Sequence, residues 1–184
     1  MLGRFILTSV LLLAPAACGD QVVRVGGQMM SGSYNAGEFG YAAGERDLRV
    51  VIVGNPFRGE RIAFERVVTD AMRGRNHGQK TNFTTSPGPS ARKEYRVVMV
   101  FNPQANLIGD KVCQGDPLAL PTTAGEGTAV SLVAVSCRSD RSLAQVRGDI
   151  DTAAGPDDPI FGALVGQSTR ALFPNNRRKR KSRD

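Results

Sequence analysis

The sequence of 184 residues contains no tryptophan, only one histidine and three cysteines, and aromatic residues make up 6% of it. Any histidine-dependent mechanism is therefore limited to His77, which lies in a glycine-flanked polar stretch with no carboxylate or nucleophile beside it. The G-x-S-x-G elbow of acyl-transfer serines is also absent. Two thiols and one distant histidine do not make the four-ligand shell of a structural zinc site. We therefore predict no catalytic residue, no metal site and no cofactor.

Long hydrophobic runs are also missing after the first residues of the chain. The apolar run Phe5–Ala14 has ten residues, whereas a transmembrane helix needs about 20. One cation, Arg4, precedes this run, and small residues follow it. That order is typical of a secretory signal peptide, which we assign to residues 1–17.

The end of the signal allows two cleavage sites. Ala14-Pro15-Ala16 fits the A-x-A pattern of ordinary secretion. Ala16-Ala17-Cys18 resembles the lipobox of bacterial lipoproteins, although Pro15 stands where leucine is usual. The resemblance, which covers only the N-terminus, implies that Cys18 carries palmitate-type acyl chains. In such lipoproteins an aspartate after the cysteine is associated with inner-membrane retention, so Gly19 favours the periplasmic face of the outer membrane.

Counting the cysteines favours the lipoprotein interpretation. An odd thiol in an exported protein needs an explanation, and lipidation of Cys18 leaves Cys113 and Cys137 as a natural pair. Export also provides the oxidising compartment in which a disulfide persists. We predict a Cys113–Cys137 disulfide that closes a loop of about 25 residues and contributes roughly 3.5 kcal/mol.

The excess of positive charge is concentrated at the C-terminus. Residues 177–184 contribute +5 of the formal net charge of +7, whereas residues 18–176 carry only +1. Because export makes nucleic acid an improbable partner, we expect a solvated tail that contacts anionic envelope material. The cations concerned are Arg177, Arg178, Lys179, Arg180, Lys181 and Arg183.

The mature chain of 167 residues suits one domain. Seven glycines in residues 19–47 indicate a flexible tether, so we divide the mature chain into a lipid anchor and tether over 18–46, a domain over 47–174 and a basic tail over 175–184.

The elements of the domain are predicted from β-branched runs, a 3.6-residue apolar repeat and Asp-Pro helix starts. They are strands over 48–53, 95–101, 128–137 and 142–150, and helices over 58–73 and from 159 to 173. The order strand, helix, strand, strand, strand, helix predicts an α+β fold with two helices on a small mixed sheet of about four strands.

Two of these strands end in the same dipeptide, Asn55-Pro56 and Asn102-Pro103. If the strands are parallel neighbours, the two asparagines lie together at the carboxyl edge of the sheet, where ligands tend to bind. Asn55 and Asn102 are therefore candidates for a shallow polar recess. The alternative is that Asn-Pro simply ends a strand, because proline removes a ladder donor.

These observations predict a membrane-anchored envelope lipoprotein with a non-enzymatic interaction or assembly role. Its expected partners are the membrane, through the lipid anchor, and an anionic envelope component or an envelope protein. A secreted or periplasmic ligand-binding protein or hydrolase that uses the polar loops is the alternative. The residues do not identify the partner, the ligand or the oligomeric state.

Overall fold

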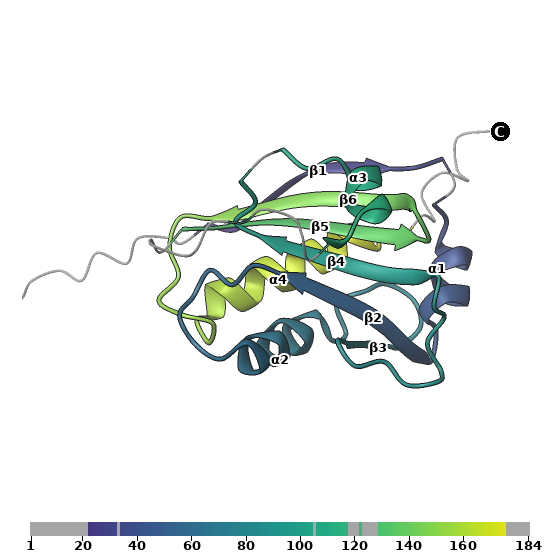
Figure 1. The fold of residues 1–184 in the computed structure, drawn as a ribbon, viewed down its shortest axis with the longest axis horizontal. Helices are drawn as coiled ribbons and strands as arrows, with labels where there is room; N and C mark the ends of the chain where they lie inside the picture. The colour runs from purple at the N-terminus through teal and green to yellow at the C-terminus, as the bar shows by residue number, and fades with distance from the viewer. Residues whose placement is uncertain (1–21, 33, 105, 118–121, 123–128, 176–184) are drawn as a thin grey trace, which may run out of the picture.

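The computed structural model describes residues 22–32, 34–104, 106–117, 122 and 129–175. A mixed sheet of six strands, in the order β1-β6-β5-β4-β2-β3, runs through the centre of the fold (Figure 1). β2 pairs in parallel with both β3 and β4, and the other pairs are antiparallel. The strands are β1 Arg24–Met30, β2 Arg46–Val53, β3 Thr81–Thr84, β4 Tyr95–Phe101, β5 Val130–Arg138 and β6 Arg141–Ile150.

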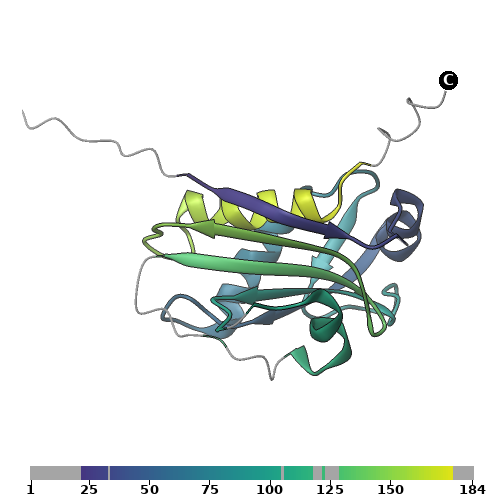
Figure 2. The same cartoon turned by 90° about the horizontal axis from the view of Figure 1, so that it is seen from above.

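Helices cover both faces of the sheet, so the fold has more than one core. The helices are α1 Ala36–Ala43, α2 Arg61–Met72, α3 Gly109–Gln114 and α4 Pro159–Leu172. α1, α2 and α4 bury the larger apolar cluster, and α3 covers a smaller cluster on the opposite face. Figure 2 shows α4 and α3 on the two sides of the sheet.

The α+β class with a mixed sheet is confirmed, but the sheet and the set of helices are larger than expected. Within the described residues the sheet has six strands rather than about four, and four helices pack on it rather than two. The predicted strand over 95–101 matches β4, and its parallel pairing with the strand before the first long helix is correct. Asp158 caps α4 as predicted, since its carboxylate accepts a hydrogen bond from the Ile160 amide at 3.1 Å.

The flexible tether predicted for residues 18–46 is wrong for residues 24–43. β1 pairs with β6 along five register positions, and Arg24 forms an ion pair with Asp149 and Asp151 at 2.5 Å each. α1 begins at its N-cap Asn35, whose side chain accepts a hydrogen bond from the Glu38 amide at 2.7 Å. The domain therefore starts more than 20 residues before the expected boundary at residue 47.

Two short elements lie between the predicted elements, where no helix or strand was expected. β3 occupies part of residues 74–93 and adds an edge to the sheet beside β2. α3 lies within residues 103–127.

The strands give the domain two distinct ends. At the Arg24 end, β1 begins and β6 finishes, because Arg24 pairs with Asp149. The helix α4 also begins at this end (Figure 2). At the hairpin end, β5 turns into β6 at Arg138 and Arg141, α1 lies across the strands, and α4 finishes. The Tyr34 hydroxyl donates to the Pro174 carbonyl at 3.5 Å, which ties the segment after β1 to the segment after α4.

Candidate functional site

The disulfide between Cys113 and Cys137 is present, which confirms the predicted pairing. Their Cα atoms lie 5.6 Å apart, and both residues are buried. The bond joins α3 to the end of β5, so it fixes a helix of six residues to the sheet. A helix this short is not stable alone in water, and the disulfide provides a covalent attachment.

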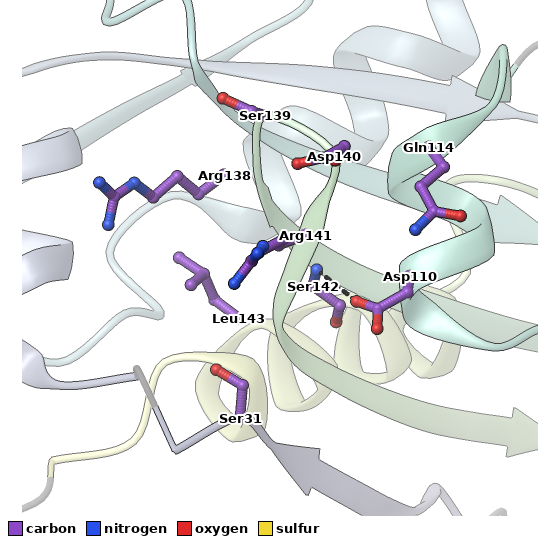
Figure 3. A pocket seen from close by; sticks show the side chains of 9 residues that line it. All are labelled: Ser31, Asp110, Gln114, Arg138, Ser139, Asp140, Arg141, Ser142 and Leu143. Carbon is purple, nitrogen blue, oxygen red and sulfur yellow. Dashed lines mark hydrogen bonds between the residues drawn. The ribbon is translucent and has the colours of Figure 1, made fainter.

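A solvent-open hollow of about 700 Å³ lies beside this attachment, at the hairpin end. Figure 3 shows Arg138 and Arg141 on one side of the β5–β6 hairpin and Asp110 and Gln114, from α3, on the other side, so the hollow borders both faces of the hairpin. We call it the hairpin hollow. Its lining is Ser31, Asp110, Gln114 and residues 138–143.

The arginine side of the hairpin hollow holds two like charges directly opposite each other. Arg138 and Arg141 are register partners across the two-residue turn between β5 and β6. Like charges in that position destabilise a sheet, because their Cβ atoms are only about 5 Å apart. Glu38 offsets one of them, since its carboxylate lies 3.0 Å from the Arg138 guanidinium. Within the described part of the chain, the Arg141 guanidinium has no acidic or hydrogen-bonding partner.

Carboxylates line the same hollow. One oxygen of Asp110 accepts a hydrogen bond from the Ser142 amide at 2.8 Å, which holds α3 against β6 (Figure 3). Asp140 is exposed at the tip of the turn, and its carboxylate pairs with none of the residues that the structure describes. Charges of both signs therefore border the hollow, the two arginines on the α1 face of the hairpin and Asp110 on the α3 face.

The turn between Arg138 and Arg141 is held in place by its neighbours. Ser139 adopts a φ of 53°, an uncommon value for a residue other than glycine. Its amide donates to the Glu94 carbonyl at 2.6 Å. Arg96 donates from one nitrogen to the Ser139 carbonyl at 3.0 Å and from another to the Cys113 carbonyl at 2.6 Å. Burial, and then the nearby Arg49, lower the pKa of Arg96, whose cation links the turn to α3.

Asn55 and Asn102 lie at the same edge of the sheet, as their parallel strands require. Val53 and Val100, two residues before each of them, are register partners. Both side-chain oxygens already accept main-chain hydrogen bonds, that of Asn55 from the Phe57 amide and that of Asn102 from the Ser131 amide, each at 2.9 Å. These bonds fit a strand-ending role, and the polar recess stays a prediction.

The other predicted site residues lie outside the described part of the chain. Cys18 is four residues before Val22, where that part begins at the Arg24 end. The described part ends at Asn175, near the hairpin end, so the cations of the basic tail lie outside it. Lipidation and contact with an anionic surface therefore stay predictions. None of the helices in the described ranges is long and apolar enough to cross a membrane.

His77 lies at a second hollow, of about 710 Å³, next to α1. Tyr34, Tyr41 and Gln79 also line it, together with the last residues before the tail. The Arg92 guanidinium lies 3.5 Å from the centre of the Tyr41 ring, which is a cation–π contact. His77 is thus separate from the lining of the hairpin hollow. The described residues contain no cluster of three or more His, Cys, Asp or Glu that would hold a metal ion.

The sequence did not reveal the hairpin hollow. Residues 138–141 lie between two predicted strands, and Asp110 and Gln114 lie between the predicted strands over 95–101 and 128–137, where no element was expected. One local signal was available, namely two arginines flanking a two-residue turn. The position of Asp110 opposite that turn depends on the disulfide, which brings distant residues together.

Comparisons with known proteins do not assign this chain to a family. No family model matches it, and no curated protein does. Among solved structures it is similar to the PelC dodecamer from Paraburkholderia phytofirmans and to a single-substitution variant of that protein. In each case the TM-score is 0.44 and the identity 10%, over 84% of this chain and 99% of the other. This likeness is too low to support any statement about assembly or function.

Proposed function

We propose that this protein is an envelope lipoprotein, anchored to a bacterial outer membrane at Cys18, with a non-enzymatic interaction role in the periplasm. The observation that carries the proposal is the separation of the two ends of the domain. The anchor cysteine precedes the Arg24 end by a few residues, whereas the hairpin hollow lies at the opposite end. An anchored domain would thus present the hairpin hollow away from its membrane.

The replacement of the long tether by β1 and α1 makes this arrangement more specific. Arg24, where β1 begins, is only six positions after Cys18. Six residues span at most about 20 Å even when fully extended. A lipidated Cys18 would hold the Arg24 end close to the bilayer, and the basic tail would leave from the far end. The anionic partner of that tail would then be a surface or polymer away from the anchoring leaflet.

The disulfide supports an exported location, because structural disulfides persist in oxidising compartments. It also explains the odd number of cysteines, since Cys113 and Cys137 are bonded to each other and Cys18 remains for another role. The hairpin hollow is consistent with a binding role, because it presents Asp140 and Arg141 at the surface, and neither pairs with another residue in the described part of the chain.

Mass spectrometry of the mature N-terminal peptide tests the anchor. We expect acyl chains on Cys18, and replacement of Cys18 by alanine should move the protein out of the membrane fraction. A mature chain that begins at Ala17 without acyl chains would refute the anchor.

Deletion of residues 177–184 tests the tail separately. Each Lys or Arg near an anionic surface contributes about 1 kcal/mol, and salt screens that attraction. We therefore expect the deletion to weaken co-sedimentation with isolated cell-wall material at low salt and to have little effect at high salt. Equal co-sedimentation of both chains at low salt would contradict the tail's role without bearing on Cys18.

A further inference from the structure

The hollow beside α1 differs from the others in the chemistry of its lining. The hairpin hollow and three further hollows each include at least one acidic or basic side chain. The lining beside α1 contains no Asp, Glu, Lys or Arg, in a chain of which 22% is charged. We call this hollow the α1 groove. Its walls come from α1, from residues 77–79 and from residues 174–175.

Glycines leave the α1 side of the groove bare. Gly37, Gly40, Tyr41 and the C-cap Gly44 follow the spacing i, i+3, i+4 and i+7, so they share one face of the helix, and the buried residues of α1 lie on the other side. A side chain at Gly44 would overlap the Gln79 carboxamide, so the fold requires that glycine. A Cβ at Gly40 would make an ordinary contact of 3.4 Å with the same group. Because glycine weakens a helix relative to alanine, α1 gives up stability at Gly40 and keeps its backbone open to the groove.

Tyr41 borders this bare face as an exposed aromatic ring that is already held in place. Tyr41 is 54% exposed. The Arg92 guanidinium lies 3.5 Å from the centre of its ring, and Arg92 Nε donates to the Tyr41 carbonyl at 2.9 Å. The ring also meets Tyr95 at an angle of 71°, with centroids 6.3 Å apart. A ligand that packs on the exposed part of this ring therefore has little side-chain entropy to remove.

The loop before β3 forms the opposite wall. The Gln79 carboxamide lies over the glycine face of α1, so it is on the same side of the helix as Tyr41. The Asn76 side chain donates to the Gln79 carbonyl at 2.8 Å, and Gly78 adopts a φ of 95°, which together shape the bend of the loop. Within the described part of the chain, the Gln79 carboxamide and the His77 imidazole have no hydrogen-bond partner. Both are available to a ligand.

The segment after α4 closes one end of the groove with a second side-chain amide, that of Asn175. The hydrogen bond from Tyr34 to the Pro174 carbonyl holds this segment beside α1. Side-chain amides both donate and accept hydrogen bonds without carrying charge. The groove of about 710 Å³ falls in the range of about 300–1,000 Å³ that is usual for small-molecule sites.

A sugar with an acetamido group matches this combination of groups. The C–H face of a sugar ring is apolar and packs on an aromatic ring, whose face is electron-rich. The C=O and N–H of the acetamido group pair with a side-chain amide, and the hydroxyls pair with the remaining donors and acceptors. Such a sugar is uncharged, as the lining is.

We propose that the α1 groove binds an N-acetylated sugar within an uncharged stretch of an envelope glycan, with the sugar ring on Tyr41 and the acetamido group on Gln79. His77 and Asn175 hydrogen-bond to the ring hydroxyls. The groove lies at the hairpin end, where α1 crosses the strands (Figure 1). The inference thus gives the proposed interaction role a ligand, and it rests on the proposed anchor only for the side of the domain on which that glycan would be met.

Isothermal titration calorimetry on the purified full chain, in a detergent without a sugar headgroup, tests the proposal with triacetylchitotriose as the probe. Cellotriose is the matched control ligand, because it has the same linkage and carries hydroxyls in place of the acetamido groups. We expect triacetylchitotriose to bind at millimolar concentration or below. Cellotriose should bind about tenfold more weakly, since one hydrogen bond is worth about a factor of ten in binding.

The variant Gly40→Ala separates binding from folding. The added methyl group fits the folded domain and favours the helix, so the melting temperature should rise. The same methyl group narrows the groove, so triacetylchitotriose should bind about tenfold more weakly. Gly162→Ala is the matched control, because it adds a methyl group to α4 at a place where a Cβ meets nothing within 4 Å. That variant should bind like the wild type.

Two side-chain variants assign the contacts. Tyr41→Ala should weaken both saccharides about tenfold, and Tyr41→Phe, which keeps the ring, should restore binding. Gln79→Leu should remove the difference between triacetylchitotriose and cellotriose. Gln167→Leu makes the same change at an exposed position of α4 and should keep that difference.

Three results would overturn the proposal. They are no binding of triacetylchitotriose at millimolar concentration, equal binding of the two saccharides by the wild type, and undiminished binding by Gly40→Ala. The first two use only the wild-type chain, so they do not depend on the folding of a variant. The assay needs neither acyl chains on Cys18 nor the basic tail, so its failure would leave the proposed anchor standing. A mature chain without acyl chains would refute the anchor and leave the α1 groove standing.

Discussion

Removal of the disulfide is the perturbation whose cost can be worked out most directly. Cys113 and Cys137 are 24 positions apart, so the bond closes a loop of about 25 residues. The loop-closure entropy for that length corresponds to about 3.5 kcal/mol at 25 °C. We expect the variant with both cysteines changed to alanine to lose about that much free energy of unfolding. In a domain of this size, the loss should lower the melting temperature by roughly 7–14 °C.

Urea unfolding of the oxidised wild type and of the double-alanine variant measures this loss. Both sulfur positions are buried, so the alanines also remove some packing, and a reduced wild-type sample separates the two contributions. A loss of less than about 1 kcal/mol in both samples would refute the argument that the bond restrains the unfolded chain. It would mean that the unfolded chain is already restrained or that the bond costs the native state energy.

The same variant makes a local prediction at the hairpin hollow. Without the bond, two hydrogen bonds among the described residues still attach α3 to the turn and the sheet: that from the Ser142 amide to Asp110 and that from Arg96 to the Cys113 carbonyl. The Ser142 amide should then exchange with solvent faster. Unchanged protection of that amide would show that packing alone holds α3.

Three further changes test the packing and the electrostatics of the domain. Gly54→Ala should destabilise by at least about 2 kcal/mol, because φ at Gly54 is 75° and a new Cβ would lie 2.6 Å from the Phe101 carbonyl oxygen; a thermal melt like that of the wild type would refute this. Phe161→Ala should cost about 3–5 kcal/mol in urea unfolding, because the ring is fully buried and packs 5.6 Å from the Phe101 ring. Hydrogen bonds to the Asp47 carboxylate, of which the one from the Asn82 side-chain amide has the largest effect, lower the pKa of Asp47 below its usual value. The ionised carboxylate therefore stabilises the fold above about pH 4, and this stabilisation is lost as the pH falls through the lowered pKa. Asp47→Asn should therefore flatten the acid side of the stability–pH curve, and an unchanged curve would contradict the assignment.

The parts of the fold with a strong local signal could be predicted from the sequence. β4 and β5 consist largely of apolar residues, because both faces of these strands are buried. α4 carries its own start signal in Asp158 and Pro159. In each case the residues themselves contain the cause of the element, so the pattern was sufficient.

The missed elements owe their structure to distant residues. β1 contains two consecutive glycines, and what holds it is its ladder with β6 and the ion pairs of Arg24, more than 120 positions away. α1 also contains two glycines, and it is stabilised by packing of its apolar face on the rest of the domain. The Phe39 and Phe173 rings, for example, have centroids 4.3 Å apart. α3 depends on the disulfide. Local propensity was misleading at these places because tertiary contacts decide the outcome.

The site was less predictable than the fold for the same reason. Pairing of Cys113 with Cys137 followed from counting thiols and was correct. The charged lining of the hairpin hollow required the register of β5 against β6 and the placement of α3, neither of which is contained in a short stretch of sequence.

The position of β1 also determines how the domain would respond to mechanical force. A pull on the chain before Arg24 and an opposite pull after Pro174 would act at opposite ends of the domain, along the direction of β1. β1 and α4 start at the same end, so the load would shear β1 along β6 and stress its ladder of five register pairs at the same time. A strand loaded from the other direction would instead peel away one pair after another. A domain held by its first strand and pulled by its tail is therefore built in the orientation that resists force best.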